Sequence, residues 1–200
     1  MKFKFIGGNL CLDFINTVGD HLNAKGSEYL RNYEDLLAWG VAAGIFSEAE
    51  KEQFAARVDP KSAEAAQILK KAVRLREILF KMLRALISKK APAPTLTEEF
   101  NGYLNEALKH LRVEQTGEHF SFNWKNSKDD PEQIAWIITW SAANLLVDEN
   151  LRLLKMCGDQ SCGWLFLDTS KNKRRAWCDM KDCGNRYKLR RYYSKSRSSE

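Results

Sequence analysis

Four cysteines near the end of the chain constrain its fold more than any other feature. They form two pairs with the same C-x4-C spacing, Cys157 with Cys162 and Cys178 with Cys183, and 15 residues separate the pairs. Two short cysteine brackets joined by a loop are typical of a tetrahedral structural metal site, because each bracket turns the backbone so that both thiolates face one ion. A four-thiolate set favours zinc and, less often, an iron–sulfur cluster. We therefore predict a structural Zn²⁺ site formed by these four cysteines.

Disulfide or redox chemistry and a chance grouping of buried thiols are the alternatives to zinc. Disulfides form in oxidising compartments, but the start of the chain does not resemble a signal peptide, because Gly7 and Asp13 interrupt its apolar stretch. No apolar run reaches the length of a membrane span. We therefore expect a cytoplasmic protein without a membrane partner. A catalytic zinc is disfavoured, since four thiolates leave no open coordination position. The fifth cysteine, Cys11, is expected to be a buried apolar side chain.

The excess positive charge of the chain lies in the same segment as the cysteines. Residues 151–200 contain 13 Lys/Arg and 5 Asp/Glu, a balance of +8, whereas residues 1–150 contain 19 Lys/Arg and 21 Asp/Glu. Basic residues on an ordered metal scaffold favour nucleic-acid binding through phosphate groups. The alternative is a basic tail that only aids solubility. The charge alone is compatible with binding to DNA or to RNA, and to single-stranded or double-stranded nucleic acid.

Hydrophobic periodicity predicts a mainly α protein of two domains, with a small β-hairpin. Residues 1–150 are expected to form a mostly helical domain that senses a ligand or dimerises, and residues 151–200 a basic zinc finger. The hairpin is expected at 112–124, around Gly117. The most apolar run, Pro131 to Met156, predicts one continuous helix that enters Cys157 without a linker. Such a helix would either dock the metal segment rigidly on the helical domain or transmit movements of that domain to it.

The cysteine segment itself predicts a treble-clef-like finger, with a strand at 164–167, a return strand at 174–177 and a helix that begins at Cys183. Leu189, Tyr192 and Tyr193 would form the apolar stripe of that helix, packed against Trp164 and Phe166. Six basic residues are the candidates for contact with duplex DNA: Arg174, Arg175, Arg186, Lys188, Arg190 and Arg191. The alternative is an RNA-binding protein that uses the same module, with aromatic side chains stacked on bases.

A polar stripe on the first predicted helix is the candidate site for a small-molecule effector. Asp13, Asn16 and Thr17 stand at i, i+3 and i+4 and therefore share one face of a helix over about residues 10–18. A solvated or helix-bracing face is the alternative. No enzyme is expected, because the three histidines are scattered and no nucleophile–base motif is evident.

Several motifs resemble the CGNR zinc-finger family, named for the tetrapeptide that stands here at Cys183–Arg186. The resemblance extends over Cys157-x4-Cys162-Gly-Trp-Leu-Phe-Leu-Asp168, Arg174-Arg175-x-Trp177-Cys178 and Lys188-x-Arg190-Arg191. Upstream, Leu12-Asp-Phe-Ile-Asn-Thr17 and Tyr33-x-Asp35-Leu-Leu-x-Trp39 resemble the ABATE domain. The resemblance covers nearly the whole chain. It implies a bacterial, stress-related transcription regulator with a C-terminal DNA-binding finger. If the helical domain dimerises, the partner expected is a second copy of the chain, in a homodimer.

Overall fold

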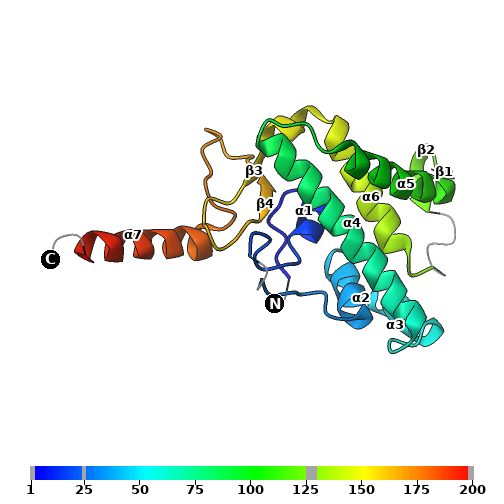
Figure 1. The fold of residues 1–200 in the computed structure, drawn as a ribbon. Helices are drawn as coiled ribbons and strands as arrows, with labels where there is room; N and C mark the ends of the chain where they lie inside the picture. Colours follow the sequence, from blue (N-terminus) through cyan, green and yellow to red (C-terminus); the bar gives the residue numbers. More distant parts are fainter. Residues whose placement is uncertain (1–2, 24–25, 125–129, 198–200) are drawn as a thin grey trace. The chain divides into compact units, whose positions relative to one another are not determined.

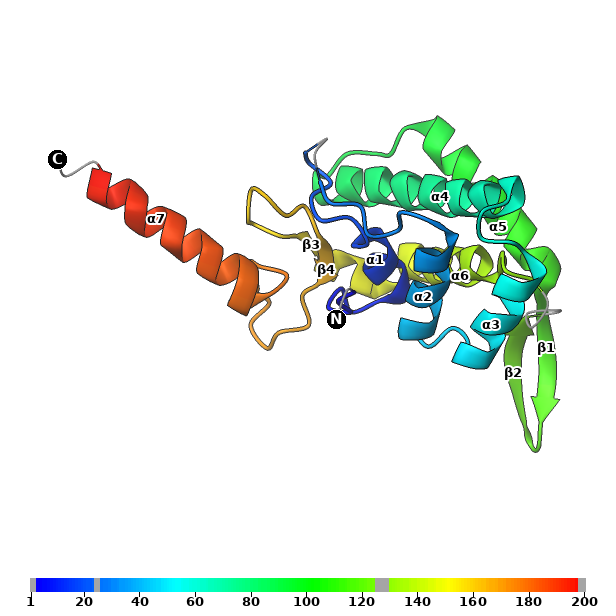
Figure 2. The same ribbon diagram turned by 90° about the horizontal axis from the view of Figure 1, so that it is seen from below.

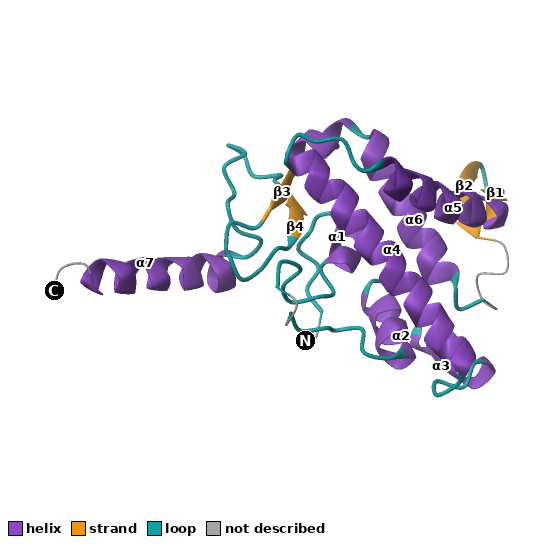
Figure 3. Cartoon of the chain, in the orientation of Figure 1, coloured by secondary structure: helices purple, strands orange, loops and turns teal. Residues whose placement is uncertain are grey.

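The computed structural model describes residues 3–23, 26–124 and 130–197. The chain forms two compact units (Figure 1). The cysteine unit consists of Met1–Tyr29 and Asp148–Glu200, and the helical unit consists of Leu30–Val147. Helices dominate, and two short antiparallel strand pairs accompany them (Figure 3). The predicted fold class, mainly α with a small β-hairpin and a C-terminal zinc finger, is confirmed.

The described residues of the helical unit form five helices: α2 (Tyr33–Ala42), α3 (Glu48–Arg57), α4 (Ala63–Ile87), α5 (Pro94–His110) and α6 (Gln133–Val147). Side-chain caps set their starts, because unpaired N–H groups at a helix N-terminus need acceptors. Asn32 caps α2, Ser47 and Glu50 form a capping box at the start of α3, and Ser62 caps α4.

The core of the helical unit lies between α4, α5 and α6, which run alongside one another in both ribbon views (Figures 1 and 2). Leu75, Ile78 and Ile138 are fully buried there. The predicted hairpin is present as β1 (Leu111–Thr116) and β2 (His119–Trp124), joined by Gly117 at a φ of +63°. None of the described helices combines the length and apolar character needed to cross a membrane.

The cysteine unit is built from short elements: α1 (Leu10–Ile15), the 3-10 helix η1 (Glu149–Leu153), β3 (Leu154–Met156), β4 (Leu165–Leu167), the π-helical turn η2 (Met180–Gly184) and α7 (Asn185–Arg197). Asn9 caps α1, and its side chain accepts a hydrogen bond from the Cys11 N–H. α1 ends at Ile15, three residues before the predicted end. α7 extends away from the other elements of this unit (Figures 1 and 2).

The prediction of one helix from Pro131 to Met156 was wrong. α6 ends at Val147, and the side chain of Asp148 then caps η1 by accepting a hydrogen bond from the Asn150 N–H at 2.6 Å. Asp and Asn side chains favour such local hydrogen bonds over a helical backbone, which explains the break within the run Asp148–Asn150. The inference that a continuous helix fixes the orientation of the metal segment at Cys157 therefore no longer holds.

The strand pairing in the cysteine segment also differs from the prediction. β4 pairs with β3, which precedes the first cysteine, and not with residues 174–177. The side chain of Lys155 contacts that later stretch instead, because it donates to the carbonyl oxygens of Lys173 at 2.7 Å and Arg175 at 3.4 Å. The alternation in Lys2-Phe-Lys-Phe-Ile6 is typical of a short strand, but the described residues 3–6 form none. A three-residue strand such as β3 has too little periodicity to be recognised in the sequence.

The first 29 residues belong to the cysteine unit, whereas the sequence division at 150/151 places them with the helices. Asn16, directly after α1, pairs with both backbone groups of Leu165 in β4. Its side-chain amide donates to the Leu165 carbonyl, and its side-chain oxygen accepts from the Leu165 N–H, each at 2.9 Å. Gly7 O accepts from the Leu167 N–H at 2.8 Å, and the Trp164 indole N–H donates to Val18 O at 2.7 Å. The N-terminal segment is thus bonded along the whole of β4.

Candidate metal centre

The four cysteine sulfur atoms converge on one buried point. The Sγ atoms of Cys157, Cys162, Cys178 and Cys183 all lie within 4.8 Å of one another. The Cys162–Cys178 and Cys178–Cys183 Sγ distances are 3.6 and 3.5 Å, far longer than the disulfide bond of about 2.05 Å, so the cysteines are free thiols. Zinc bonded to sulfur at about 2.3 Å in a tetrahedron separates its ligands by about 3.8 Å. The donor set and the spacing therefore fit zinc.

Backbone turns aim the sulfur atoms. Gly163 has a φ of +72°, which L side chains rarely adopt, and it reverses the chain directly after Cys162. The Cys157 N–H donates to Trp164 O at 2.8 Å and closes the first bracket. Asp179 caps the second bracket, with its side chain accepting from the Lys181 N–H at 2.8 Å. Each bracket is therefore a closed loop that presents two thiols inward.

Electrostatics make a cation necessary if all four sulfur atoms are to ionise. Burial raises the pKa of the Cys183 thiol, and the negative charge of Cys157 raises it further. A divalent ion reverses both effects, because it stabilises the thiolates that it binds. Four thiolates and one Zn²⁺ leave a formal charge of −2 on the centre.

Aromatic and apolar side chains surround the centre. Trp164 and Phe166 are buried against the four cysteines, and Ile6, Tyr29 and Trp177 pack at the edge of the cluster. Ile6 and Tyr29 come from the N-terminal segment, which therefore forms part of the wall around the metal site.

Arg175 is a structural part of this wall. Its guanidinium lies over the Phe166 ring, 4.3 Å from the centroid. The same group donates to the carbonyl oxygens of Trp177 at 3.0 Å, Ile6 at 3.3 Å and Cys178. A guanidinium that is stacked and bonded in this way has most of its donors in use within the chain.

A buried carboxylate inside the first cysteine bracket binds two of the predicted DNA contacts. The side chain of Asp159 has no solvent exposure, and it accepts hydrogen bonds from Arg186 Nε at 2.5 Å and Arg190 Nη1 at 2.7 Å. Burial alone would raise the pKa of Asp159, but the bond from Arg186 and those from Ser161 outweigh it and lower the pKa to about 2. Arg186 also donates to Cys183 Sγ at 3.1 Å.

A second buried carboxylate, Asp168, follows β4. It accepts from Lys155 Nζ at 2.6 Å, the Ser170 hydroxyl at 2.5 Å and the Arg175 N–H at 2.9 Å. Burial alone would raise the pKa of Asp168, yet these donors lower it well below its usual range. Sequence reasoning missed both Asp159 and Asp168 as site residues. The available signal was the presence of isolated acids within the most basic part of the chain.

The six predicted nucleic-acid contacts fall into two groups. Arg175, Arg186 and Arg190 are bonded within the cysteine unit, as described above. Arg174, Lys188 and Arg191 are exposed, and within residues 3–23, 26–124 and 130–197 no ion pair joins any of their side chains to an acid. The structure does not bring all six together as one contact surface.

The helix stripe expected to pack on Trp164 and Phe166 is exposed instead, which corrects that expectation. Leu189, Tyr192 and Tyr193 are 57%, 67% and 62% exposed. Phe166 is already covered by Arg175, and the Trp164 indole faces Val18 of the N-terminal segment. The apolar side chains of α7 therefore have surface available for a partner.

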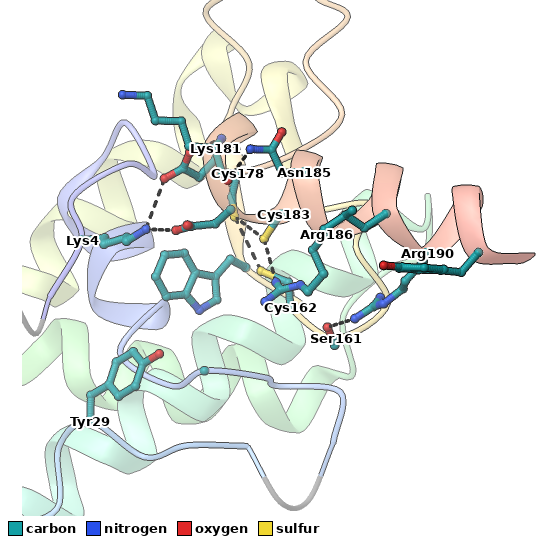
Figure 4. Close-up of a pocket in the computed structure, with 16 residues that line it drawn as sticks. Lys4, Tyr29, Ser161, Cys162, Cys178, Lys181, Cys183, Asn185, Arg186 and Arg190 are labelled. Carbon is teal, nitrogen blue, oxygen red and sulfur yellow. Dashed lines mark hydrogen bonds and ion pairs between the residues drawn. The ribbon is translucent and has the colours of Figure 1, made fainter.

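A cavity of about 600 Å³ lies beside the metal centre (Figure 4). Its lining combines the N-terminal segment (Lys4 and Tyr29), the cysteines and the first turns of α7. Lys4 forms ion pairs with Asp179 at 3.2 Å and with Asp182. Figure 4 shows Lys4 and Tyr29 on one side of the cavity and Arg186 with Arg190 on the other. No local sequence pattern marks this cavity, because its walls are more than 100 residues apart in the chain.

The candidate effector residues Asp13, Asn16 and Thr17 are buried and bonded to backbone groups. Asp13 accepts from the Gly7 N–H at 2.8 Å, Thr17 donates to Phe14 O at 2.7 Å, and Asn16 pairs with Leu165. These bonds favour the helix-bracing alternative for the stripe. Effector binding by these residues stays a prediction.

Replacement of Asp13 by Asn is expected to leave the chain at least as stable at neutral pH. Burial raises the pKa of Asp13 from 3.8 to about 6, although the Gly7 N–H opposes the shift. An acid with a higher pKa in the folded than in the unfolded chain stabilises the fold below the unfolded pKa, and this contribution is lost as the pH rises through the folded pKa. Asn imitates the protonated acid and does not titrate.

Thermal unfolding at several pH values measures this effect. Between about pH 4 and pH 7, wild type should lose about 2 kcal/mol of stability relative to Asp13→Asn. Other titrating groups cancel in the difference between the two chains. Parallel stability curves for the two proteins would show that Asp13 ionises normally in the fold.

Two family models match the chain. A model described as "CGNR zinc finger" matches residues 153–196. The ABATE model, described as "Putative stress-induced transcription regulator", matches residues 8–149. No curated protein matches the chain. The two matches meet close to the predicted boundary, while the structure assigns the first part of the ABATE match to the cysteine unit.

Proposed function

Because the chain belongs to the ABATE family and ends in a CGNR zinc finger, we propose that it regulates transcription by binding duplex DNA through its cysteine unit. The observation that carries the proposal is a set of exposed cations on a metal-ordered scaffold. Six such residues lack an acidic partner among the ion pairs of the described residues: Lys171, Lys173, Arg174, Lys181, Lys188 and Arg191.

The shape of α7 supports duplex DNA as the partner. A helix of 13 residues is about 20 Å long, and the major groove of B-DNA admits one α-helix. α7 extends away from the rest of its unit, so a groove could enclose it without displacing other elements (Figure 2). Lys188 and Arg191 would then lie near the phosphates that border the groove, and exposed polar and aromatic side chains would face the base edges.

Affinity measured against salt concentration tests the proposal. The zinc-loaded full chain is titrated with a mixed-sequence duplex and, separately, with single-stranded RNA of the same length. If 4–6 cations contact phosphates, the logarithm of duplex affinity should fall with the logarithm of salt with a slope of roughly −4 to −5. Selection from mixed DNA and RNA pools at a stated salt concentration then identifies the preferred site. A flat salt dependence would contradict a phosphate-binding role.

RNA binding is the alternative, and the exposed aromatic side chains of α7 favour it. Tyr187, Tyr192 and Tyr193 are 41–67% exposed, and unpaired bases stack readily on such rings. Preferential enrichment of single-stranded RNA in the mixed selection would replace the duplex proposal with this one.

The helical unit is proposed to sense a signal or to mediate dimerisation. Its hairpin exposes Val113, Phe120 and Phe122, which are 62%, 71% and 63% exposed. Val113 and Phe122 are directly opposite each other in the strand register, so they share one face of the hairpin. An exposed apolar face of this kind is consistent with a protein partner.

A further inference from the structure

Asp159, Ser161, Arg186 and Arg190 form a bonded set, called here the Asp159 clamp. Asp159 and Ser161 lie in the first cysteine bracket, and the two arginines lie on α7. Both carboxylate oxygens are in use: Oδ2 accepts from Arg186 Nε at 2.5 Å, and Oδ1 accepts from Arg190 Nη1 at 2.7 Å. Arg190 Nη2 also donates to the Ser161 hydroxyl at 2.7 Å. The clamp therefore joins the first bracket to the helix that follows the second.

The clamp also reaches the metal centre. Arg186 Nη2 donates to Cys183 Sγ at 3.1 Å while its Nε holds Asp159. The planar guanidinium directs two separate nitrogens at the carboxylate and the sulfur in a fixed geometry, whereas a lysine ammonium would have to reach both acceptors from one nitrogen at the end of a flexible chain. Arg186 thus connects α7, on which it lies, to both brackets.

The clamp separates two faces of α7. Arg186 and Arg190 are four residues apart and share one face, whereas Lys188 lies two residues from each and points to the opposite side. The start of α7 is held by η2, through bonds such as the one from the Asn185 side chain to Lys181 O at 2.9 Å, and Tyr187 contacts Trp177 with ring centroids 5.5 Å apart. Farther along the helix, Leu189 and Tyr193 are exposed, whereas Arg186 and Arg190 bond to the first bracket. The two arginines therefore fix the orientation of α7 relative to that bracket.

We infer that Arg186 and Arg190 are positioning residues, which fix α7 on the metal centre through Asp159 and moderate the charge on the Cys183 thiolate. They are then not phosphate contacts, and the cations left for nucleic acid are those on the other face of α7. Only this last consequence rests on the proposed function. The bonds of the clamp to the metal ligand and to Asp159 are independent of any nucleic acid.

Charge-preserving variants test the inference. Arg186→Lys and Arg190→Lys keep the charge of α7 and remove the forked donors, and Arg191→Lys is the matched control on the same helix. A merely electrostatic role predicts that all three behave like wild type. A donor to a metal-bound sulfur withdraws electron density from it, so its loss should make the thiolate a stronger electron donor.

Cobalt substitution and zinc competition give readouts at the metal itself. In Arg186→Lys the thiolate-to-cobalt charge-transfer band should move to longer wavelength, and zinc affinity against a chelator should fall roughly 10- to 100-fold. Arg190→Lys should leave the band in place and speed hydrogen exchange of α7 amides about tenfold, since the helix loses one of its two anchors. Arg191→Lys should change neither quantity.

Identical cobalt bands and zinc affinities in Arg186→Lys and Arg191→Lys would overturn the assignment. If Arg186→Lys binds no cobalt, the test rests on the hydrogen-exchange rate of the α7 amides in Arg190→Lys. An exchange rate equal to that in Arg191→Lys would contradict the clamp. A chain that shows the expected metal effects but binds neither duplex nor RNA would refute the proposed function and leave the clamp intact.

Discussion

Replacement of Cys178 by Ser is expected to abolish metal binding and to unfold the cysteine unit, including its N-terminal segment. A serine hydroxyl does not ionise to replace a thiolate, and the remaining buried thiols cannot share the metal in the same geometry. Structural zinc contributes about 10 kcal/mol or more to the folding of small metal domains. That amount is comparable with the whole stability of a typical domain, which is about 5–15 kcal/mol.

Hydrogen exchange with peptide resolution, together with metal analysis, measures the effect. Amides of α1 and of β4 should lose protection together, because Asn16 pairs with Leu165 across the two segments. Amides of α4 should keep their protection. Cys11→Ala is the matched control: Cys11 is fully buried in α1 but is not a ligand, so this variant should retain one zinc per chain.

Two outcomes would contradict this prediction. If Cys178→Ser retains stoichiometric zinc, the four-cysteine site is wrong. If residues 157–190 exchange freely while α1 stays protected, the N-terminal segment folds without the metal centre, and the bonds between α1 and β4 contribute little to its stability.

The double replacement of Lys188 and Arg191 by Ala is expected to weaken duplex binding strongly. Each phosphate contact contributes about 0.9 to the salt slope, so the slope should flatten by about 1.8. At about 0.1 M salt, each lost contact corresponds to roughly an eightfold loss, and the two together to about 60-fold. Metal content and α7 helicity should not change, because neither side chain belongs to the Asp159 clamp.

The matched control is the double replacement of Lys81 and Arg84 by Ala on α4. These two exposed cations have the same spacing and the same total charge, but they lie in the helical unit. The control should retain wild-type affinity and slope at every salt concentration. Equal losses in both double variants would mean that net charge, not the surface of α7, determines binding.

Local patterns in the sequence were sufficient for the metal ligands and for most of the helices. The cysteine spacing predicted a set of four thiols that the fold brings within 4.8 Å of one another. The caps at Asn9, Asn32 and Ser47 are local signals of the same kind, since a cap and its helix lie within four residues of each other.

The incorrect predictions have two sources. Some depend on bonds between residues that are distant in the sequence, and others on short polar runs inside a longer apolar run. Apolar periodicity concealed the break at Asp148, because a single capping side chain there redirects the backbone. Nothing near Asn16 shows that its partner is Leu165, and so the N-terminal segment was grouped with the helices. A division of the chain by composition cannot detect a unit that is assembled from both ends.

The allocation of the arginines illustrates the same limit for the site. Arg175, Arg186 and Arg190 look like Arg174 and Arg191 in the sequence, as five cations in a basic segment. Their roles differ because three of them find buried partners, Phe166 for the first and Asp159 for the other two. Charge counts predict a nucleic-acid surface, but buried acids decide which cations remain free to form it.

Zinc titration of metal-free full chain, with duplex binding followed in parallel at several salt concentrations, tests the central claim most directly. Binding should appear as zinc is added, reach its maximum at one zinc per chain, and then show a salt slope of roughly −4 to −5. Metal-free chain that binds the duplex as tightly as zinc-loaded chain, or zinc-loaded chain that shows no salt-dependent binding, would contradict the proposal that the metal shapes a nucleic-acid-binding surface.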